Sequence, residues 1–303
     1  MGHKESKGAE ILLDPVFISR IRSLSFRARL VVEGFMAGLH RSPYHGFSAE
    51  FRDHRSYQPT DPPRLVDWRV FARSDKLYVK QFTDETNLRA YLLVDCSGSM
   101  GYRGDGPLTK HDYARSLAAS LALLLLKQRD AVGLCLFDET ARSWIRPSTA
   151  SGQLERILGE LVIHDPSGET RPTEAFTAMA SRIPPRGLII VLSDFLFPAE
   201  TQMKALRHLA SGKHELVVIR ILDKSERSLS FSGLVTLKDL ETKKTLTVRP
   251  ALLREAYRNR VYGTWRALEN DLSRFRAHLV DVDTTEPFSK ALLALLAARR
   301  KMR

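Results

Sequence analysis

The stretch that decides the fold runs Arg89-Ala-Tyr-Leu-Leu-Val-Asp95-Cys-Ser97-Gly-Ser99. Its first six residues are almost all apolar and have the length of a strand that is buried on both faces. The alternation that follows lets Asp95, Ser97 and Ser99 turn toward one point, and Gly98 permits a tight loop between the two serines. The segment therefore predicts a central strand that ends in a cluster of oxygen atoms.

Strand-length apolar runs and segments of helical period alternate after this strand. Further strands are predicted over residues 131–137, 187–192, 216–222 and 277–282. Helices are predicted over residues 109–127, 152–161, 174–181 and 201–209, over a segment with apolar Tyr257, Val261, Trp265, Leu268, Leu272 and Phe275, and from about Pro287. A hairpin is expected between residues 233–237 and 245–248. The alternation indicates an α/β fold with a doubly wound, mostly parallel sheet and helices on both faces.

The chain before this alternation has a different character. A short amphipathic segment begins at Pro15, and the following residues are dense in Arg, Tyr, Pro, Asp and His, which is typical of turns and short strands. We therefore expect two parts: an Arg-rich, β-containing N-terminal segment over residues 1–87, packed on a main domain over residues 88–303.

Composition indicates a folded chain. Of 303 residues, 43% are hydrophobic and 27% are charged, which argues against disorder. The formal net charge of +12 would attract nucleic acid, acidic proteins or anionic lipid alike. Because the basic residues are interleaved with acidic ones, the charge favours a solvated surface over a nucleic-acid site. Cys96 and Cys135 lie in apolar runs, so neither a disulfide framework nor a cysteine-based zinc site is expected.

Sequence features also bear on location. The longest apolar run, residues 121–126, is far shorter than the roughly 18 residues that a membrane span needs. The first residues are polar and lack the apolar core of a signal peptide. The expected location is therefore the cytoplasm.

Oxygen-bearing residues recur where predicted strands end or helices begin. They are Asp95, Ser97 and Ser99 after the first strand, Thr170 in a loop before a helix, and Asp194 after a later strand. In open parallel sheets, ligand sites form outside the carboxyl ends of the strands, so these segments should converge. Carboxylates and hydroxyls are a hard donor set that suits Mg²⁺ or Mn²⁺ rather than zinc.

Together these residues resemble the metal-ion-dependent adhesion site of von Willebrand factor A domains. The resemblance implies that fold and a metal set of Asp95, Ser97, Ser99, Thr170 and Asp194, holding Mg²⁺, with Mn²⁺ or Ca²⁺ as alternatives. It also implies an open coordination position for a partner's carboxylate, so that the metal joins two proteins and breaks no bond. Thr170 is preferred to Thr173 because it stands six residues before Phe176, the spacing usual in that family.

The N-terminal part carries a second resemblance. Its residues are Gly46-Phe-Ser-Ala-Glu50-Phe51, Arg55, Tyr57, Asp61, Arg64, Asp67-Trp68, Ala72-Arg73 and Tyr78-Val79-Lys80. They are similar to the signature of the bacterial family called domain of unknown function 58, whose members accompany MoxR-type AAA+ ATPases. Thr60-Asp61-Pro62-Pro63 departs from the usual Gly-Asp followed by another acid. The resemblance implies a non-enzymatic adaptor or chaperone-like partner of such an ATPase or of its client protein.

Two other functions are compatible with parts of the sequence. A Mg²⁺- or Mn²⁺-dependent phosphohydrolase would use carboxylates and a metal, but aspartyl-phosphate phosphatases carry a second Asp where this chain has Ser97. A nucleic-acid-binding protein rests on the net charge alone. Asp105 and Asp138 are interpreted as solvated loop residues. Arg55, Arg64, Asp67, Trp68 and Arg73 are expected either to join the N-terminal segment to the main domain or to form a partner surface.

Overall fold

The computed structural model describes residues 10–39, 54–56, 71, 78–80, 88–104, 106–210, 212–273, 275 and 277–302. The chain forms two compact units, one of residues 1–38 with 88–303 and the other of residues 39–87. A unit boundary therefore lies at residue 88, where the sequence changes character, whereas the first 38 residues belong to the larger unit.

The smaller unit contains two short antiparallel strands, β1 (His54–Ser56) and β2 (Tyr78–Lys80), with His54 opposite Lys80. Arg55 lies in β1. Arg64, Asp67, Trp68 and Arg73 of the N-terminal signature fall outside the described residues, as does Asp105 in the larger unit.

A six-stranded sheet forms the centre of the larger unit, in the order β10-β7-β6-β3-β4-β5. The strands are β3 (Arg89–Asp95), β4 (Ala131–Phe137), β5 (Ala141–Ser148), β6 (Leu188–Ser193), β7 (Glu215–Leu222) and β10 (Ala277–Asp283). All neighbours pair in parallel except β4 and β5, which are antiparallel. The five strands predicted from apolar runs are confirmed, and β5 is an additional edge strand.

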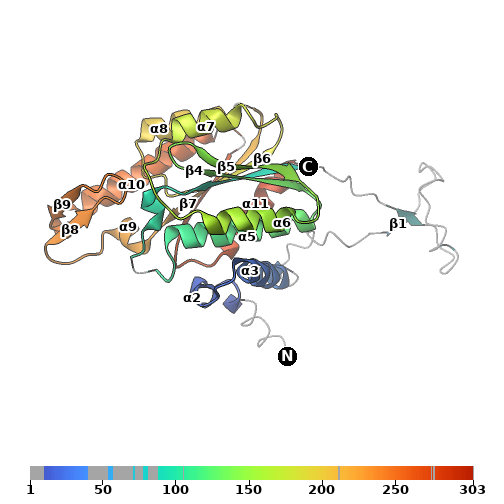
Figure 1. Ribbon diagram of the computed structural model, residues 1–303, viewed down its shortest axis with the longest axis horizontal. Coiled ribbons are helices and arrows are strands. Elements are labelled where there is room, and N and C mark those ends of the chain that lie inside the picture. The colour runs from blue at the N-terminus through green and yellow to red at the C-terminus, as the bar shows by residue number, and fades with distance from the viewer. Residues whose placement is uncertain are drawn as a thin grey trace. The chain divides into compact units, whose positions relative to one another are not determined.

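Helices cover both faces of this sheet (Figure 1). On one face lie α5 (Lys110–Lys127), α6 (Gln153–Ile163) and α11 (Ser289–Met302), and on the other lie α7 (Pro172–Ala180), α8 (Ala199–Ala210) and α10 (Pro250–Leu272). The core under α7 and α8 includes an edge-to-face pair of Phe137 and Phe176, with ring centroids 5.0 Å apart. On the opposite face Tyr113 stacks on Phe288 at 4.5 Å. The predicted doubly wound arrangement is confirmed.

The larger unit begins with helices, not with strands. They are α2 (Pro15–Ser19) and α3 (Leu24–Leu39), and α3 buries Ala28, Val31, Val32 and Phe35. The interpretation of residues 24–39 as turns and short strands was wrong, because these four positions follow the i, i+3, i+4, i+7 spacing of a helix face.

A short helix and a hairpin lie between β7 and α10. They are α9 (Lys224–Ser228) and the antiparallel pair β8 (Val235–Lys238) and β9 (Thr245–Val248), which is the predicted hairpin. Within the part of the chain that the structure describes, no helix combines the length and apolar character needed to cross a membrane.

Candidate metal centre

An aspartate ends or follows each of the five parallel strands. These residues are Asp95, Asp138, Asp194, Asp223 and Asp283. Because parallel strands end at the same edge of a sheet, all five lie along one rim, which we call the aspartate rim. The chain leaves β3 for β4 on one side and later places β6 on the other, so β3 stands at the topological switch point where ligand sites form.

The loop after β3 brings three predicted site residues together. The Ser97 backbone N–H donates to Asp95 Oδ1 at 2.9 Å. The hydroxyl oxygens of Ser97 and Ser99 lie 3.1 Å apart, in hydrogen-bond contact. Asp95 and Ser97 have no exposed surface. The structure therefore brings two hydroxyls and a carboxylate together at the end of β3, with Asp95 and Ser97 buried and Ser99 partly exposed.

Gly98 is required by close packing as well as by the turn. Its N–H donates to the Gly168 carbonyl at 2.9 Å. A Cβ atom at this position would lie 3.0 Å from the Leu240 carbonyl oxygen and 3.1 Å from that of Gly168. Both are backbone atoms, which cannot rotate out of the way, so a larger residue would separate the three loops.

Among the described residues, Asp95 forms no ion pair, whereas its neighbour Asp194 pairs with Lys110. Its Oδ2 accepts a 2.6 Å hydrogen bond from the Ser193 hydroxyl, a contact that the sequence did not predict. Burial, reinforced by the charge of Asp194, raises the pKa of Asp95 to about 7, although hydrogen bonds from Ser193 and Ser97 oppose the shift. Because burial is the larger cause, the raised pKa reflects mainly the loss of solvent around the ionised form of Asp95, and the nearby charge of Asp194 adds to it.

Asp194 has a cationic neighbour that the sequence analysis missed. The Lys110 ammonium group lies 2.7 Å from Asp194 Oδ2 and 2.7 Å from Glu226 Oε1. Its side chain is fully buried, and the two carboxylates overcome the effect of burial and raise the pKa of Lys110. Lys110 is the first residue of α5, where the helix dipole disfavours a cation. A lysine at this position could have indicated from the sequence that a buried acidic side chain lies nearby.

The loop that carries Thr170 lies against the end of β3, and the partner of Thr170 itself is Glu241. The Ser167 N–H donates to the Cys96 carbonyl at 2.9 Å, which holds the loop against the end of β3. The Thr170 hydroxyl donates to Glu241 Oε1 at 3.0 Å, and its N–H donates to Glu241 Oε2 at 3.2 Å. Thr173, the alternative, lies inside α7, whose N-cap is Arg171.

Asp138 differs from its predicted role. It is only 4% exposed and forms an ion pair with Arg142, and its Oδ1 accepts from the Thr140 N–H at 3.2 Å. The interpretation of Asp138 as a solvated loop residue was therefore wrong, because Asp138 is buried and β5 supplies its counter-ion, Arg142.

The donor set fits a hard divalent cation. Neighbouring ligands of an octahedral ion bound at about 2.1 Å are separated by about 3 Å, which matches the Ser97–Ser99 hydroxyl spacing of 3.1 Å. Lys110 pairs with both Asp194 and Glu226, so these three groups carry a formal charge of one minus before Asp95 is counted. In the described part of the chain no three His, Cys, Asp or Glu side chains converge as ligands, so a cation here would depend on the hydroxyls.

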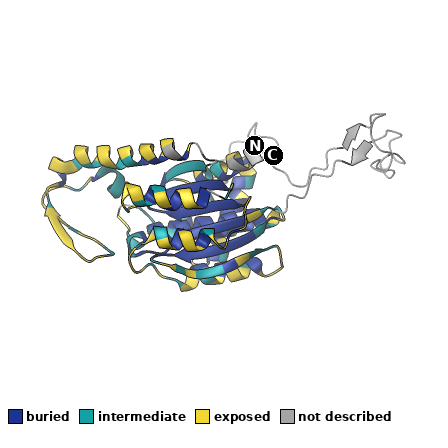
Figure 2. Ribbon diagram, turned by 90° about the horizontal axis from the view of Figure 1, so that it is seen from above, coloured by how far each residue is buried: buried dark blue, intermediate teal, exposed yellow. Residues whose placement is uncertain are grey.

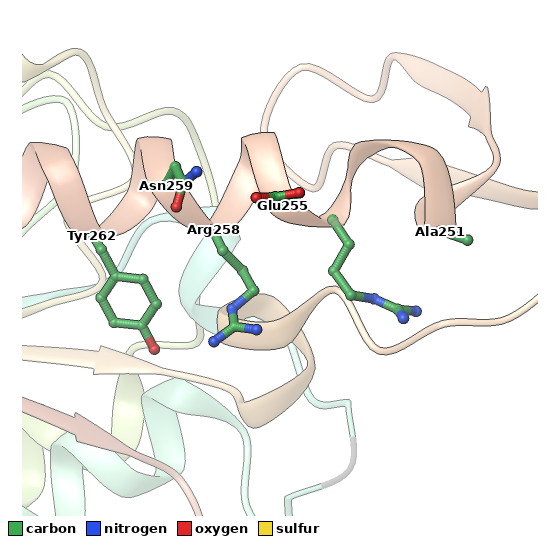
Figure 3. Close-up of a pocket in the computed structure, with 6 residues that line it drawn as sticks. Ala251, Glu255, Arg258, Asn259 and Tyr262 are labelled. Atoms are coloured by element: carbon green, nitrogen blue, oxygen red, sulfur yellow. The ribbon is translucent and has the colours of Figure 1, made fainter.

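A separate hollow runs along α10 (Figure 3). It is lined by Ala251, Arg254, Glu255, Arg258, Asn259 and Tyr262. All six belong to α10 and none to the aspartate rim, so this hollow is not part of the candidate metal centre.

The order of the sheet and the helices on both faces define an α/β protein of the von Willebrand factor A type. The chain belongs to the family described as Protein of unknown function DUF58, whose model matches residues 53–264.

Several known proteins are similar to this chain. The uncharacterized protein Rv1480 of Mycobacterium tuberculosis is 26% identical over 294 residues, covering 95% of this chain and 91% of the relative, and Mb1516 of Mycobacterium bovis matches equally. The crystal structure of the conserved hypothetical protein BatB from Bacteroides thetaiotaomicron covers 71% of this chain and 100% of its own, with 16% identity and a TM-score of 0.50. The VWA domain of SpRpn10 gives 11% identity over 68% of this chain and 93% of its own, with a TM-score of 0.41.

Proposed function

We propose that this protein is a metal-dependent protein-binding module, an adaptor or chaperone-like partner of a MoxR-type AAA+ ATPase or of that ATPase's client. In this proposal, Mg²⁺, with Mn²⁺ or Ca²⁺ as alternatives, joins the aspartate rim to an acidic side chain of the partner. The observation that carries the proposal is the group of Asp95, Ser97 and Ser99 at the switch point, in which Asp95 and Ser97 are fully buried and the two hydroxyls are in contact.

Each predicted residue has a separate task. Ser97, Ser99 and Thr170 would supply neutral hydroxyl ligands, and Asp95 and Asp194 would supply charge, directly or through water. A bound cation would provide the positive charge that attracts a carboxylate. Because hydroxyls donate little charge to the metal, the cation keeps a strong affinity for an additional anionic ligand.

The hydrogen bonds of Asp95 and the protonation of the two cysteines favour binding over catalysis. Both oxygens of Asp95 already accept hydrogen bonds, from the Ser97 N–H and from the Ser193 hydroxyl, which weakens the carboxylate as a nucleophile. Burial raises the pKa values of Cys96 and Cys135 to about 12, so both thiols stay protonated and unreactive at neutral pH. The position two residues after Asp95 carries a serine, where phosphatases that form an aspartyl phosphate carry an acid.

The test combines metal titration with partner binding. The double variant Ser97→Ala/Ser99→Ala should lose Mn²⁺ binding in calorimetry. It should also lose Mg²⁺-dependent affinity for the purified MoxR-type ATPase of the same bacterium. The control Ser230→Ala/Ser232→Ala removes two exposed hydroxyls at the same spacing and should change neither. Full partner affinity of the first variant in Mg²⁺, or wild-type binding that persists in EDTA, would refute the metal bridge.

A further inference from the structure

The tip of the β8–β9 hairpin reaches the candidate metal centre. Both carboxylate oxygens of Glu241 accept hydrogen bonds from Thr170, one from its hydroxyl and one from its N–H. The neighbouring Leu240 carbonyl packs over Gly98, between the two serines of the loop after β3. Glu241 is therefore an acidic side chain of this chain that lies beside a predicted metal ligand.

The tip is built to present this carboxylate. The Asp239 side chain accepts from the N–H of Glu241 at 2.8 Å and from the hydroxyl of Thr242 at 2.6 Å. The Asp239 N–H donates to the Lys244 carbonyl at 2.8 Å, which closes the turn. Lys243 adopts a positive φ of 62° and its ammonium group donates to the Leu240 carbonyl. These bonds fix the conformation of the turn independently of the contact between Glu241 and Thr170.

The rest of the hairpin is open to solvent. Figure 2 shows its strands exposed along most of their length, and Leu246 in β9 is 63% exposed. The root of the hairpin is fixed by Arg254, whose guanidinium donates to the carbonyls of Leu229 and Phe231, both at 3.1 Å. The hairpin is thus an exposed arm that is anchored near its root and whose tip contacts Thr170 and Gly98.

We infer that Glu241 is a further ligand of this metal centre, and that it holds from within the chain the position at which an acidic side chain of a partner would bind. The inference rests on the proposed function. The Thr170 hydroxyl oxygen and Glu241 Oε1 are 3.0 Å apart, the same spacing of about 3 Å that separates neighbouring ligands of an octahedral ion. A hydroxyl can donate its proton to a carboxylate while its oxygen binds a cation.

The internal ligand sets the kind of partner that the site accepts. A tethered carboxylate competes at an effective concentration of about millimolar, so a free carboxylate at lower concentration does not displace it. A productive partner must therefore bring a Glu or Asp side chain together with contacts that move the hairpin aside.

The first experiment measures metal binding and the hairpin itself. Glu241→Gln keeps the shape of the side chain and removes its charge, and Glu255→Gln is the control, an exposed glutamate on α10. Mn²⁺ affinity by calorimetry should fall about tenfold in Glu241→Gln and stay unchanged in the control. In wild-type protein Mg²⁺ should slow amide exchange of residues 239–244 relative to EDTA, and this protection should vanish in Glu241→Gln.

The second experiment measures competition, with the peptide acetyl-Gly-Glu-Gly-amide as the probe. In Mn²⁺, the Glu241→Gln variant should bind the probe about tenfold more tightly than the wild type, as reported by paramagnetic broadening of the peptide protons. Equal binding of the probe by both proteins would contradict the internal ligand.

The outcomes separate this inference from the proposed function. If wild-type protein binds Mn²⁺ through Ser97 and Ser99, and Glu241→Gln changes neither metal affinity nor exchange of residues 239–244, the internal ligand is refuted and the metal bridge stands. If wild-type protein binds no divalent cation, the proposed function fails and the inference fails with it.

Discussion

Replacing Lys110 by methionine tests the charge balance of the aspartate rim. The ammonium group makes two contacts of 2.7 Å, with Asp194 and Glu226, and its side chain is fully buried. At an effective dielectric constant of about 20, each contact contributes about 6 kcal/mol of Coulomb attraction, which the desolvation of the buried ions offsets by several kcal/mol. Removing the cation leaves two carboxylates unpaired, so the free energy of unfolding should fall by about 3–5 kcal/mol.

Urea unfolding followed by circular dichroism measures this loss without the screening that a salt denaturant adds. Lys127→Met is the matched control, because Lys127 is an exposed lysine at the opposite end of the same helix and should cost less than about 1 kcal/mol. The double variant Lys110→Met/Glu226→Gln should recover part of the loss. Mg²⁺ should stabilise Lys110→Met, because a cation at the rim restores positive charge. A loss in Lys110→Met no larger than in the control would refute the reasoning.

Three further predictions concern close packing at Gly98, the titration of His111 and the hydrogen bonds of Gln153. Gly98→Ala should lower the free energy of urea unfolding by about 1–2 kcal/mol, because the new Cβ atom meets the Leu240 carbonyl. The control Gly159→Ala, at an open helix position, should raise it by about 0.5–1 kcal/mol. A change of the same sign in both variants would contradict the packing argument. Burial lowers the pKa of His111 to about 4 from 6.5, so below pH 6.5 the unfolded chain binds a proton that the folded chain does not. The contribution of His111 to the free energy of unfolding is therefore complete above pH 6.5 and should decline by about 3 kcal/mol by pH 4. Urea midpoints from pH 7 to 4 should fall more steeply than in His111→Gln, and equal slopes would disprove this effect. Gln153→Ala removes the amide donor that lies 2.6 Å from the Val132 carbonyl and 2.9 Å from the Arg146 carbonyl. Calorimetric unfolding should therefore reveal a loss of about 1–3 kcal/mol, and an unchanged melting temperature would contradict this.

The central sheet was predictable because its strands are buried on both faces. A run such as Leu188–Ser193 is apolar at nearly every position, and burial of that kind leaves a clear trace in the sequence. β5 left no such trace, because an edge strand is only half buried and tolerates Pro147. The helix α3 was missed because Gly34 and Gly38 lower its helix propensity, while packing of its buried face overrides that preference.

The candidate site was predictable only where its residues follow one strand. The spacing of Asp95, Ser97 and Ser99 is local, so the turn itself determines their convergence. Lys110 meets Glu226 across 116 positions of sequence, and Thr170 meets Glu241 across 71. Such pairs depend on how loops from distant strands fold over the rim, and nothing in the neighbouring residues specifies that.

The aspartate rim lies in a chain whose formal net charge is +12. The local charge of the rim and the net charge of the chain act on association at different distances. The overall charge attracts an acidic partner from a distance, where salt screens it, so ionic strength should change mainly the rate of encounter. Under the proposed function, the carboxylates of the rim would repel an acidic partner at contact, so the lifetime of the complex should depend on the divalent cation. Salt would then change mainly the association rate constant, and a chelator would change mainly the dissociation rate constant. Stopped-flow association and separate dissociation measurements could distinguish the two effects.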